Sequence, residues 1–242
     1  SFSSRHMIIV CYGNFLLVPA SLEGDDRMNL TKVPIHFIGI GGAGMSGIAK
    51  ILLQLGAKIS GSDLKESETI IHLREMGAKI NIGHDSDNIG ADVRTVVYSS
   101  AIPQDNPEMQ EAKKRGIEIL ARAEMLARLM ARQESIAVAG AHGKTTTTAM
   151  ISLMLELNDM DPTIIIGGDL RQIGSNAKLG RGKYLVAEAD ESDGSFLKLF
   201  PKIAVITNIE NDHLDYYRTV KNIVNAFVRF LEQIPADGFA VI

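Results

Sequence analysis

A glycine-containing turn near the middle of the chain holds the residue types with the clearest chemistry. Residues 135–148 read SIAVAGAHGKTTTT, in which an apolar run leads through Gly140 and Gly143 into Lys144 and Thr145. A bound triphosphate needs backbone N–H groups at a helix N-terminus, glycines that admit its oxygens, a lysine for the β- and γ-phosphate charge and a hydroxyl for Mg²⁺. All four parts are present, so the segment predicts a phosphate-binding loop.

The loop is a shortened form of the usual pattern, which places a glycine five residues before the glycine-lysine pair. Val138 stands at that position, and the first glycine is Gly140. A glycine turn that only caps an ordinary helix is the alternative. The strand-like run before the turn and the helix-like run after it favour the phosphate-binding loop.

A second glycine motif lies nearer the N-terminus. Residues 37–46 read FIGIGGAGMS, which gives Gly39, Gly41 and Gly44 a G-x-G-x-x-G spacing, and Asp63 closes the next strand-like run. Such a motif holds a pyrophosphate at a helix N-terminus, while the carboxylate accepts a hydrogen bond from a ribose hydroxyl. NAD, a uridine diphosphate sugar and purely structural glycines all remain open on this motif alone.

Acidic residues crowd behind a third apolar run. Residues 184–196 read YLVAEADESDGSF, with Glu188, Asp190, Glu191 and Asp193 within six positions. Carboxylates without partners at a buried strand end repel one another, and a bound cation would relieve that repulsion. Glu188 is the first of them beyond the strand. The alternative is a solvated acidic loop.

A histidine follows a fourth apolar run. Residues 203–217 read IAVITNIENDHLDYY and open into a polar loop that contains Asn208 and His213. A histidine beside aspartates is usually a surface side chain when it stands alone. The carboxyl ends of parallel strands, however, line one edge of a sheet, where ligands bind. We therefore expect Lys144, Glu188 and His213 to converge on one triphosphate and its metal ions.

The elements that must position these residues alternate between strand and helix from Pro34 onward, which predicts an α/β fold with parallel sheets. One helix is well marked, because Asn106 suits the N-cap, Pro107 the first position and Gly116 the end. A stripe of apolar residues predicts another helix over 220–231. The predicted strands span residues 35–38, 58–60, 79–82, 95–99, 117–120, 136–139, 163–166, 184–187 and 203–207.

The order of these elements predicts two domains. After a helix-like stretch over 121–133, a boundary is expected near Arg132, because a new strand-loop-helix unit with its own nucleotide signal begins there. Residues 28–132 then form a Rossmann-like nucleotide-binding domain, and residues 133–242 form an α/β domain with the phosphate-binding loop. The last letters, GFAVI, resemble the start of another strand, so we expect the second domain to be truncated.

Residues 1–27 do not resemble the rest of the chain. The first seven resemble a remnant of cloning, and the next have a faint signal-peptide character that is interrupted at residues 12–14 and is short for a membrane span. We expect an N-terminal extension, with Met28 as the natural start. A removed secretion signal is the alternative.

Composition narrows the function classes. The chain has 242 residues, of which 45% are apolar, enough for one large or two modest cores. A net charge of −4 without a run of Lys or Arg argues against nucleic acid as a partner. The single cysteine, Cys11, fits a reducing compartment, so we expect a cytoplasmic protein with no membrane partner.

Taken together, in this order and spacing, the three nucleotide-site segments resemble the Mur ligases, the ATP-dependent amino-acid ligases of peptidoglycan precursor synthesis. The resemblance runs from about Ile35 to the last residue and is carried by FIGIGGAGMSGIA, SGSD, SSAIPQDNPE, RAEMLA, AGAHGKTTTT, AEADESDGSF and TNIENDHLDYY. Within the family it favours the members that join L-alanine to UDP-N-acetylmuramate. The members that attach a recycled tripeptide to the same sugar have a cysteine in the glycine loop, where Gly42 and Ala43 stand here.

The resemblance implies a UDP-sugar rather than NAD in the first domain, and ATP with Mg²⁺ in the second. Lys144, Glu188 and His213 would be catalytic, and Thr145, Glu188 and His213 would hold the metal ions. The implied ATP contacts are Gly140, Ala141, His142, Gly143, Lys144, Thr145 and Thr146. The implied UDP-sugar contacts are Gly39, Gly41, Gly42, Gly44, Met45, Ser46, Asp63, Ser99 and Asn176.

Mur ligases also have a C-terminal domain that closes over the site and helps to bind the amino acid. We expect that domain to be absent from this chain, and therefore expect the chain alone to form no amide. The alternatives are a tripeptide-adding ligase, a regulatory protein that holds a UDP-sugar and ATP without joining them, and an NAD-dependent oxidoreductase. The sequence predicts no oligomeric state.

Overall fold

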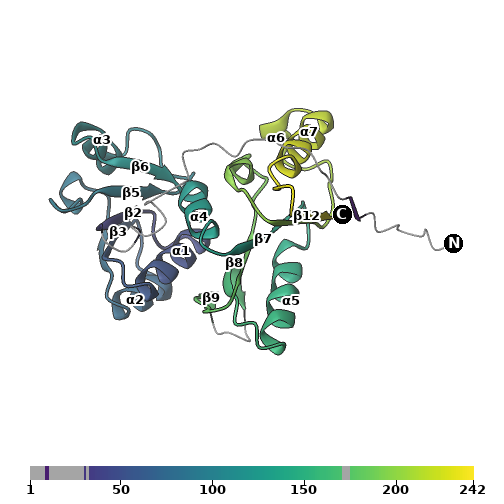
Figure 1. Ribbon diagram of the computed structural model, residues 1–242. Coiled ribbons are helices and arrows are strands. Elements are labelled where there is room, and N and C mark those ends of the chain that lie inside the picture. The colour runs from purple at the N-terminus through teal and green to yellow at the C-terminus, as the bar shows by residue number, and fades with distance from the viewer. Residues whose placement is uncertain (1–8, 11–29, 31–32, 171–174) are drawn as a thin grey trace. The chain divides into compact units, whose positions relative to one another are not determined.

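The computed structural model describes residues 9–10, 30, 33–170 and 175–242. They fall into two compact units. Unit 1 is built mainly from residues 129–163 and 180–242, and unit 2 from residues 33–128 and 164–179. Both units combine helices with parallel strands, which confirms the predicted α/β fold class (Figure 1).

Unit 2 contains a parallel sheet with the strand order β4-β3-β2-β5-β6. Each of its predicted strands is found, within three residues at either end. The strands are β2 (Ile35–Ile38), β3 (Ile59–Asp63), β4 (Lys79–Ile82), β5 (Thr95–Tyr98) and β6 (Glu118–Ala121), and the helices are α1 (Ala43–Gln54), α2 (Glu68–Glu75), α3 (Pro107–Lys114), α4 (Arg122–Met130) and the 3₁₀ turn η3 (Ser86–Asn88).

Unit 1 contains neighbouring strands in the order β1-β12-β11-β7-β10, parallel except for the β1–β12 pair. In register, Glu188 of β10 lies opposite Val138 of β7, and Ile206 of β11 opposite Ala139. The carboxyl ends of these three strands therefore lie together. The elements are β1 (Ile9–Val10), β7 (Glu134–Ala139), α5 (Lys144–Leu157), β10 (Tyr184–Glu188), η4 (Ser195–Lys198), β11 (Ile203–Ile206), α6 (Leu214–Tyr217), α7 (Val220–Leu231) and β12 (Phe239–Val241).

An antiparallel pair, β8 (Thr163–Leu170) and β9 (Ser175–Lys178), departs from the prediction of parallel strands. The β9 sequence, SNAK, lacks the alternating apolar residues by which a strand is recognised. Contacts with α1 hold it instead, because the Lys50 ammonium donates hydrogen bonds to Ser175 Oγ and Asn176 Oδ1, each at 2.9 Å. β9 is thus set by tertiary structure rather than by its own pattern.

The helix predicted from its capping residues is confirmed. Asn106 Oδ1 accepts the N–H groups of Glu108 at 2.9 Å and Met109 at 3.3 Å, Pro107 begins the helix, and Gly116 follows it with a φ of +64°. These contacts satisfy N–H groups that have no partner inside a helix. Across the described residues, none of the helices combines the length and the apolar character that a membrane span requires.

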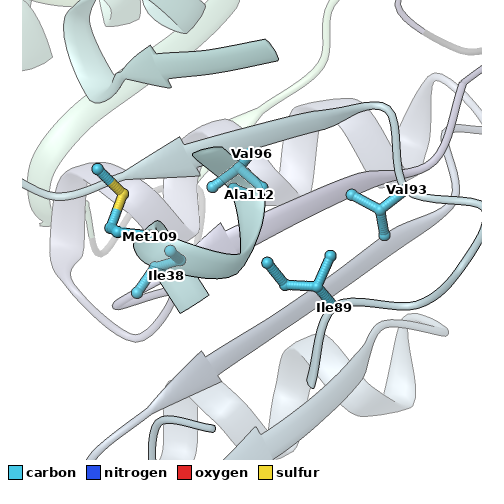
Figure 2. Packing of buried hydrophobic residues seen from close by; sticks show 6 residues of the cluster. All are labelled: Ile38, Ile89, Val93, Val96, Met109 and Ala112. Atoms are coloured by element: carbon cyan, nitrogen blue, oxygen red, sulfur yellow. The ribbon is translucent and has the colours of Figure 1, made fainter. Parts of the chain in front are cut away.

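The core of unit 2 brings together the sheet, α3 and the segment that leads from η3 to β5. Its members are almost completely buried, and Figure 2 shows their side chains gathered between these elements. Apolar burial of this kind stabilises a fold by about 25 cal/mol per Å² removed from water. The cluster consists of Ile38, Ile89, Val93, Val96, Met109 and Ala112.

A carboxylate lies fully buried beside this core. Glu108, in the first turn of α3, accepts hydrogen bonds from His36 Nε2 and Ser62 Oγ, both at 2.7 Å, from His84 Nδ1 at 3.0 Å and from Asn88 Nδ2 at 3.1 Å. Burial raises the pKa of Glu108, but hydrogen bonds from His36, Ser62 and Asn88 more than offset that effect and lower the pKa below its usual range. Glu108 therefore ties β2, β3 and α3 together as an anion.

Candidate functional site

The loop that we expect to bind phosphate has the predicted strand-turn-helix form. β7 ends at Ala139, and α5 begins at Lys144 after Gly143, whose φ is +82°. Gly140 has a φ of +134°, and a Cβ at this position would overlap Thr207 Oγ1 and lie 2.8 Å from the Asn208 carbonyl oxygen. A side chain at Gly140 would therefore separate the loop from the end of β11.

Asn208 clamps the loop. Its carbonyl oxygen accepts the Ala141 N–H at 3.2 Å, its Oδ1 accepts the His142 N–H at 3.0 Å, and its Nδ2 donates to the His142 carbonyl at 2.8 Å. Two of the expected phosphate donors are thus used by the protein itself. Residues 143–146 open α5, and their N–H groups have no acceptor within the helix, so these groups are the candidates to meet a phosphate.

Lys144 and His213 meet at a buried carboxylate. The Lys144 ammonium donates to the Gly140 carbonyl at 2.6 Å and to Glu191 Oε1 at 2.8 Å, and His213 Nε2 lies 3.7 Å from the same oxygen. Only 3% of the Glu191 side chain is exposed. Glu188 ends β10 beside β7, at the same edge of the sheet. The structure therefore brings Lys144 and His213 together and places Glu188 on the adjacent strand end.

The acidic loop is more ordered than the sequence indicated. Asp190 Oδ1 accepts the N–H and the hydroxyl of Ser192, at 3.1 and 2.7 Å, and Asp193 Oδ1 accepts the Ser195 N–H at 2.9 Å. Two of the four carboxylates therefore have hydrogen-bond donors within their own loop. Among the side chains that the structure describes, no group of three His, Cys, Asp or Glu residues could hold a metal ion by itself.

His213 is held by the start of α6. Its backbone has a φ of +55°, its N–H donates to Asp212 Oδ1 at 2.8 Å, and its carbonyl accepts the N–H groups of Tyr216 and Tyr217. The Tyr217 hydroxyl donates to the Glu191 carbonyl at 2.5 Å. Burial raises the pKa of Tyr217 well above its usual value, so this hydroxyl stays a donor. α6 thus fixes both His213 and the backbone of Glu191.

The G-x-G-x-x-G loop of unit 2 is organised by Asp63. Its Oδ2 accepts the Gly41 N–H at 2.8 Å, and its Oδ1 accepts the Leu64 N–H at 2.8 Å. A Cβ on Gly41 would lie 3.0 Å from that Oδ2, and one on Gly44 would lie 2.9 Å from Arg122 Nη1. The carboxylate expected to bind a ribose therefore also holds the glycine loop in shape.

Other predicted sugar contacts differ in their accessibility. Ser99 follows β5 and lies beside Gly39, at the carboxyl edge of the sheet. The side chains of Met45 and Ser46 are buried. Asn176 is buried as well, and both N–H bonds of its amide are used, toward the Ala43 carbonyl at 2.7 Å and Ser46 Oγ at 2.9 Å. In this structure Asn176 anchors the first turn of α1.

Sequence reasoning assigned no role to Glu191 as distinct from its acidic neighbours, nor to Asn208. Both residues stood in segments already noted as polar. Their roles depend on the strand order, in which β10 and β11 flank β7, and this order cannot be read from the sequence pattern. The available signal was their position within four residues of a predicted strand end.

Comparison with known proteins gives one consistent result. The family model described as "Mur ligase family, catalytic domain" matches residues 34–134, and "Mur ligase middle domain" matches residues 138–242. The UDP-N-acetylmuramate–L-alanine ligase of Desulforamulus reducens is 59% identical over 222 residues, which are 91% of this chain and 47% of that protein. The chain thus spans about half the length of the curated relatives it matches.

Solved structures agree with the sequence comparison. A UDP-N-acetylmuramate-alanine ligase from Thermotoga maritima matches with a TM-score of 0.77 and 33% identity, over 83% of this chain and 47% of that one. A UDP-N-acetylmuramate:L-alanyl-gamma-D-glutamyl-meso-diaminopimelate ligase from Neisseria meningitides matches with a TM-score of 0.79 and 27% identity, over 85% of this chain and 69% of that one. Both are ligases of the same sugar nucleotide.

Proposed function

Because this chain belongs to the Mur ligase family, we propose that the complete protein uses ATP to join L-alanine to the carboxylate of UDP-N-acetylmuramate. The observation that carries the proposal is the meeting of Lys144 and His213 at one buried carboxylate beside the start of α5. The choice of L-alanine is supported by the identity with a named alanine ligase across both nucleotide motifs. We place the reaction in the cytoplasm, within peptidoglycan precursor synthesis.

The proposed reaction has two steps. An oxygen of the muramate carboxylate attacks the γ-phosphorus of ATP, and the bond from that phosphorus to the oxygen bridging it to the β-phosphate breaks. The products of this step are an acyl phosphate and ADP, which departs. The alanine nitrogen then attacks the acyl carbon and loses a proton, and inorganic phosphate departs. Activation is needed because a carboxylate is a poor acyl electrophile. The Lys144 ammonium and the N–H groups that open α5 stabilise the negative charge of the transferring phosphoryl group.

The residues present fit a Mg²⁺ ion that arrives with the nucleotide. Thr145 and Glu188 offer hard oxygen donors at the start of α5 and the end of β10, and His213 offers a nitrogen nearby. Mg²⁺ commonly takes only one or two protein ligands and completes its shell with phosphate oxygens and water. Such an ion neutralises phosphate charge. A site without three clustered ligands suits that arrangement.

Glu188→Gln is expected to raise the Mg²⁺ concentration needed for half-maximal activity of the complete enzyme, because the amide keeps the shape of the side chain but loses the charge. His213→Ala should act in the same direction. The measurement is the rate against Mg²⁺ concentration at saturating ATP, with Glu232→Gln, an exposed residue after α7, as the charge-matched control. An unchanged Mg²⁺ requirement in both variants would contradict the proposed role of Glu188 and His213 as metal ligands.

Asp63→Asn is expected to weaken UDP-sugar binding by about tenfold or more, because a hydrogen bond to a charged acceptor contributes about 1.5–3 kcal/mol. The asparagine amide has a single acceptor oxygen and no charge. It can therefore accept the N–H of Gly41 or of Leu64, but the second N–H loses its acceptor. Calorimetry with UDP-N-acetylmuramate measures the effect, and the exposed Asp87→Asn is the control. ATP affinity should not change. An Asp63 variant with full UDP-sugar affinity would contradict this role.

The test of the proposed function is phosphate release by the complete protein with UDP-N-acetylmuramate, ATP and Mg²⁺. L-Alanine should support turnover, and glycine, L-serine and the tripeptide L-Ala-γ-D-Glu-meso-diaminopimelate should support much less. Turnover with the tripeptide alone would favour the second ligase class. Binding of both nucleotides without phosphate release would favour a regulatory protein, and preferential binding of NAD would favour an oxidoreductase.

A further inference from the structure

Glu191 has a feature that its role as a partner of Lys144 does not explain. One of its carboxylate oxygens, Oε1, accepts from Lys144 at 2.8 Å and lies 3.7 Å from His213 Nε2. The other, Oε2, is buried and has no hydrogen-bond partner in the part of the chain that the structure describes. Leaving a buried polar atom unpaired costs about 1–3 kcal/mol, and more when the group is charged. A buried polar atom without a partner calls for an explanation, such as a catalytic role or a bound water or ion.

The surroundings of Glu191 favour a cation as the missing partner. Glu191 is held at two points, because the Tyr217 hydroxyl donates to its backbone carbonyl at 2.5 Å and the Lys144 ammonium donates to its side-chain Oε1 at 2.8 Å. It belongs to the loop that follows Glu188, and it contacts the lysine that opens α5. An ionised carboxylate accepts hydrogen bonds and metal ions but donates nothing. A phosphate oxygen placed against it would be repelled.

We propose that Glu191 is a positioning residue that holds Lys144 through Oε1 before nucleotide binds and presents Oε2 to the hydrated Mg²⁺ ion that accompanies the nucleoside triphosphate. This inference rests on the proposed function, because it needs a Mg²⁺-nucleotide at the start of α5. Without Mg²⁺, the negative charge of Glu191 opposes the phosphates and competes with them for Lys144. With Mg²⁺, the same charge favours the complex. Glu191 thereby makes nucleotide affinity depend on the metal.

The proposal predicts effects of opposite sign under two conditions, which a merely structural role would not produce. In Glu191→Gln, affinity for a non-hydrolysable ATP analogue should fall by about tenfold with Mg²⁺ present, the lower end of what loss of a residue near a metal costs. With EDTA present, the affinity should stay equal or rise, because the competitor for Lys144 has lost its charge. The measurement is calorimetry on the complete protein under both conditions, with Glu232→Gln as the control.

Three results would decide the matter. Equal weakening with and without Mg²⁺, or no change in either condition, would overturn the role of Glu191. If Glu191→Gln does not fold, Glu191→Asp carries the test, since it keeps the charge on a shorter side chain. The affinity of Glu191→Asp for the ATP analogue should still be lower in EDTA than in Mg²⁺. Equal affinities under the two conditions would overturn the proposal. A wild-type protein that binds no Mg²⁺-nucleotide would instead refute the proposed function.

Discussion

Replacing Lys144 by alanine is expected to lower the rate of amide formation by the complete enzyme by about 10²- to 10³-fold or more, the usual cost of losing a charge-stabilising donor. The ammonium lies beside the first turn of α5, where it meets Gly140 and Glu191. Its loss removes positive charge from the transferring phosphoryl group and leaves Glu191 buried without its cation. The measurement is single-turnover formation of the acyl phosphate with saturating ATP.

Two controls separate this effect from misfolding. Lys221→Ala removes the same charge from an exposed position on α7 and should leave the rate unchanged. UDP-sugar binding by Lys144→Ala should remain nearly intact, since the G-x-G-x-x-G loop belongs to unit 2 and Lys144 to unit 1. Turnover of the Lys144 variant within a few-fold of the wild type would contradict the assignment of the phosphate-binding loop.

Replacing Glu108 by alanine is expected to destabilise unit 2 by about 3 kcal/mol or more, because it removes the charged acceptor at the centre of a buried hydrogen-bond network. His36, Ser62 and His84 would each lose the hydrogen bond that they make to Glu108. Hydrogen exchange of β2 and β3 reports on unit 2 separately from unit 1 and therefore measures the loss. Glu111→Ala, on the same helix and paired with Lys114 at 3.7 Å, should cost less than about 1 kcal/mol.

The pH dependence of this effect has a defined sign. The pKa of Glu108 is lowered in the folded protein, so the ionised carboxylate stabilises the fold above the unfolded-state pKa of about 4.3. That contribution is lost as the pH falls through the folded-state pKa. The stability difference between the wild type and Glu108→Gln should therefore shrink when the pH is taken below about 4. A difference that stays constant with pH would show that the charge of Glu108 is not what stabilises unit 2.

Local signals were sufficient for much of this molecule. The strand, glycine turn and lysine around Gly140 predict the phosphate-binding loop, because all the residues that form it lie within about a dozen positions of one another. The cap formed by Asn106 and Pro107 is equally local, and the structure shows it as expected. Apolar runs also located β7, β10 and β11, whose carboxyl ends carry the candidate site.

Contacts between distant segments were not predictable in the same way. Asn176 was expected to face the sugar nucleotide, but its amide is used by α1, more than a hundred residues earlier in the chain. The carboxylate of Glu191 was counted among repelling charges, whereas Asp190 and Asp193 accept hydrogen bonds from their own loop and Glu191 pairs with Lys144. These outcomes depend on strand order and burial, which a residue pattern does not encode.

The clamp formed by Asn208 affects when the phosphate-binding loop can fold during synthesis of the chain. The loop that opens α5 owes its shape to an asparagine 66 positions downstream of His142, on the strand end next to its own. Contacts between segments so far apart form late, because the intervening chain must first be ordered. During synthesis, all residues of the phosphate-binding loop have been added to the chain before Asn208 emerges from the ribosome. The hydrogen bonds by which Asn208 clamps the loop can form only after β11 pairs with β7.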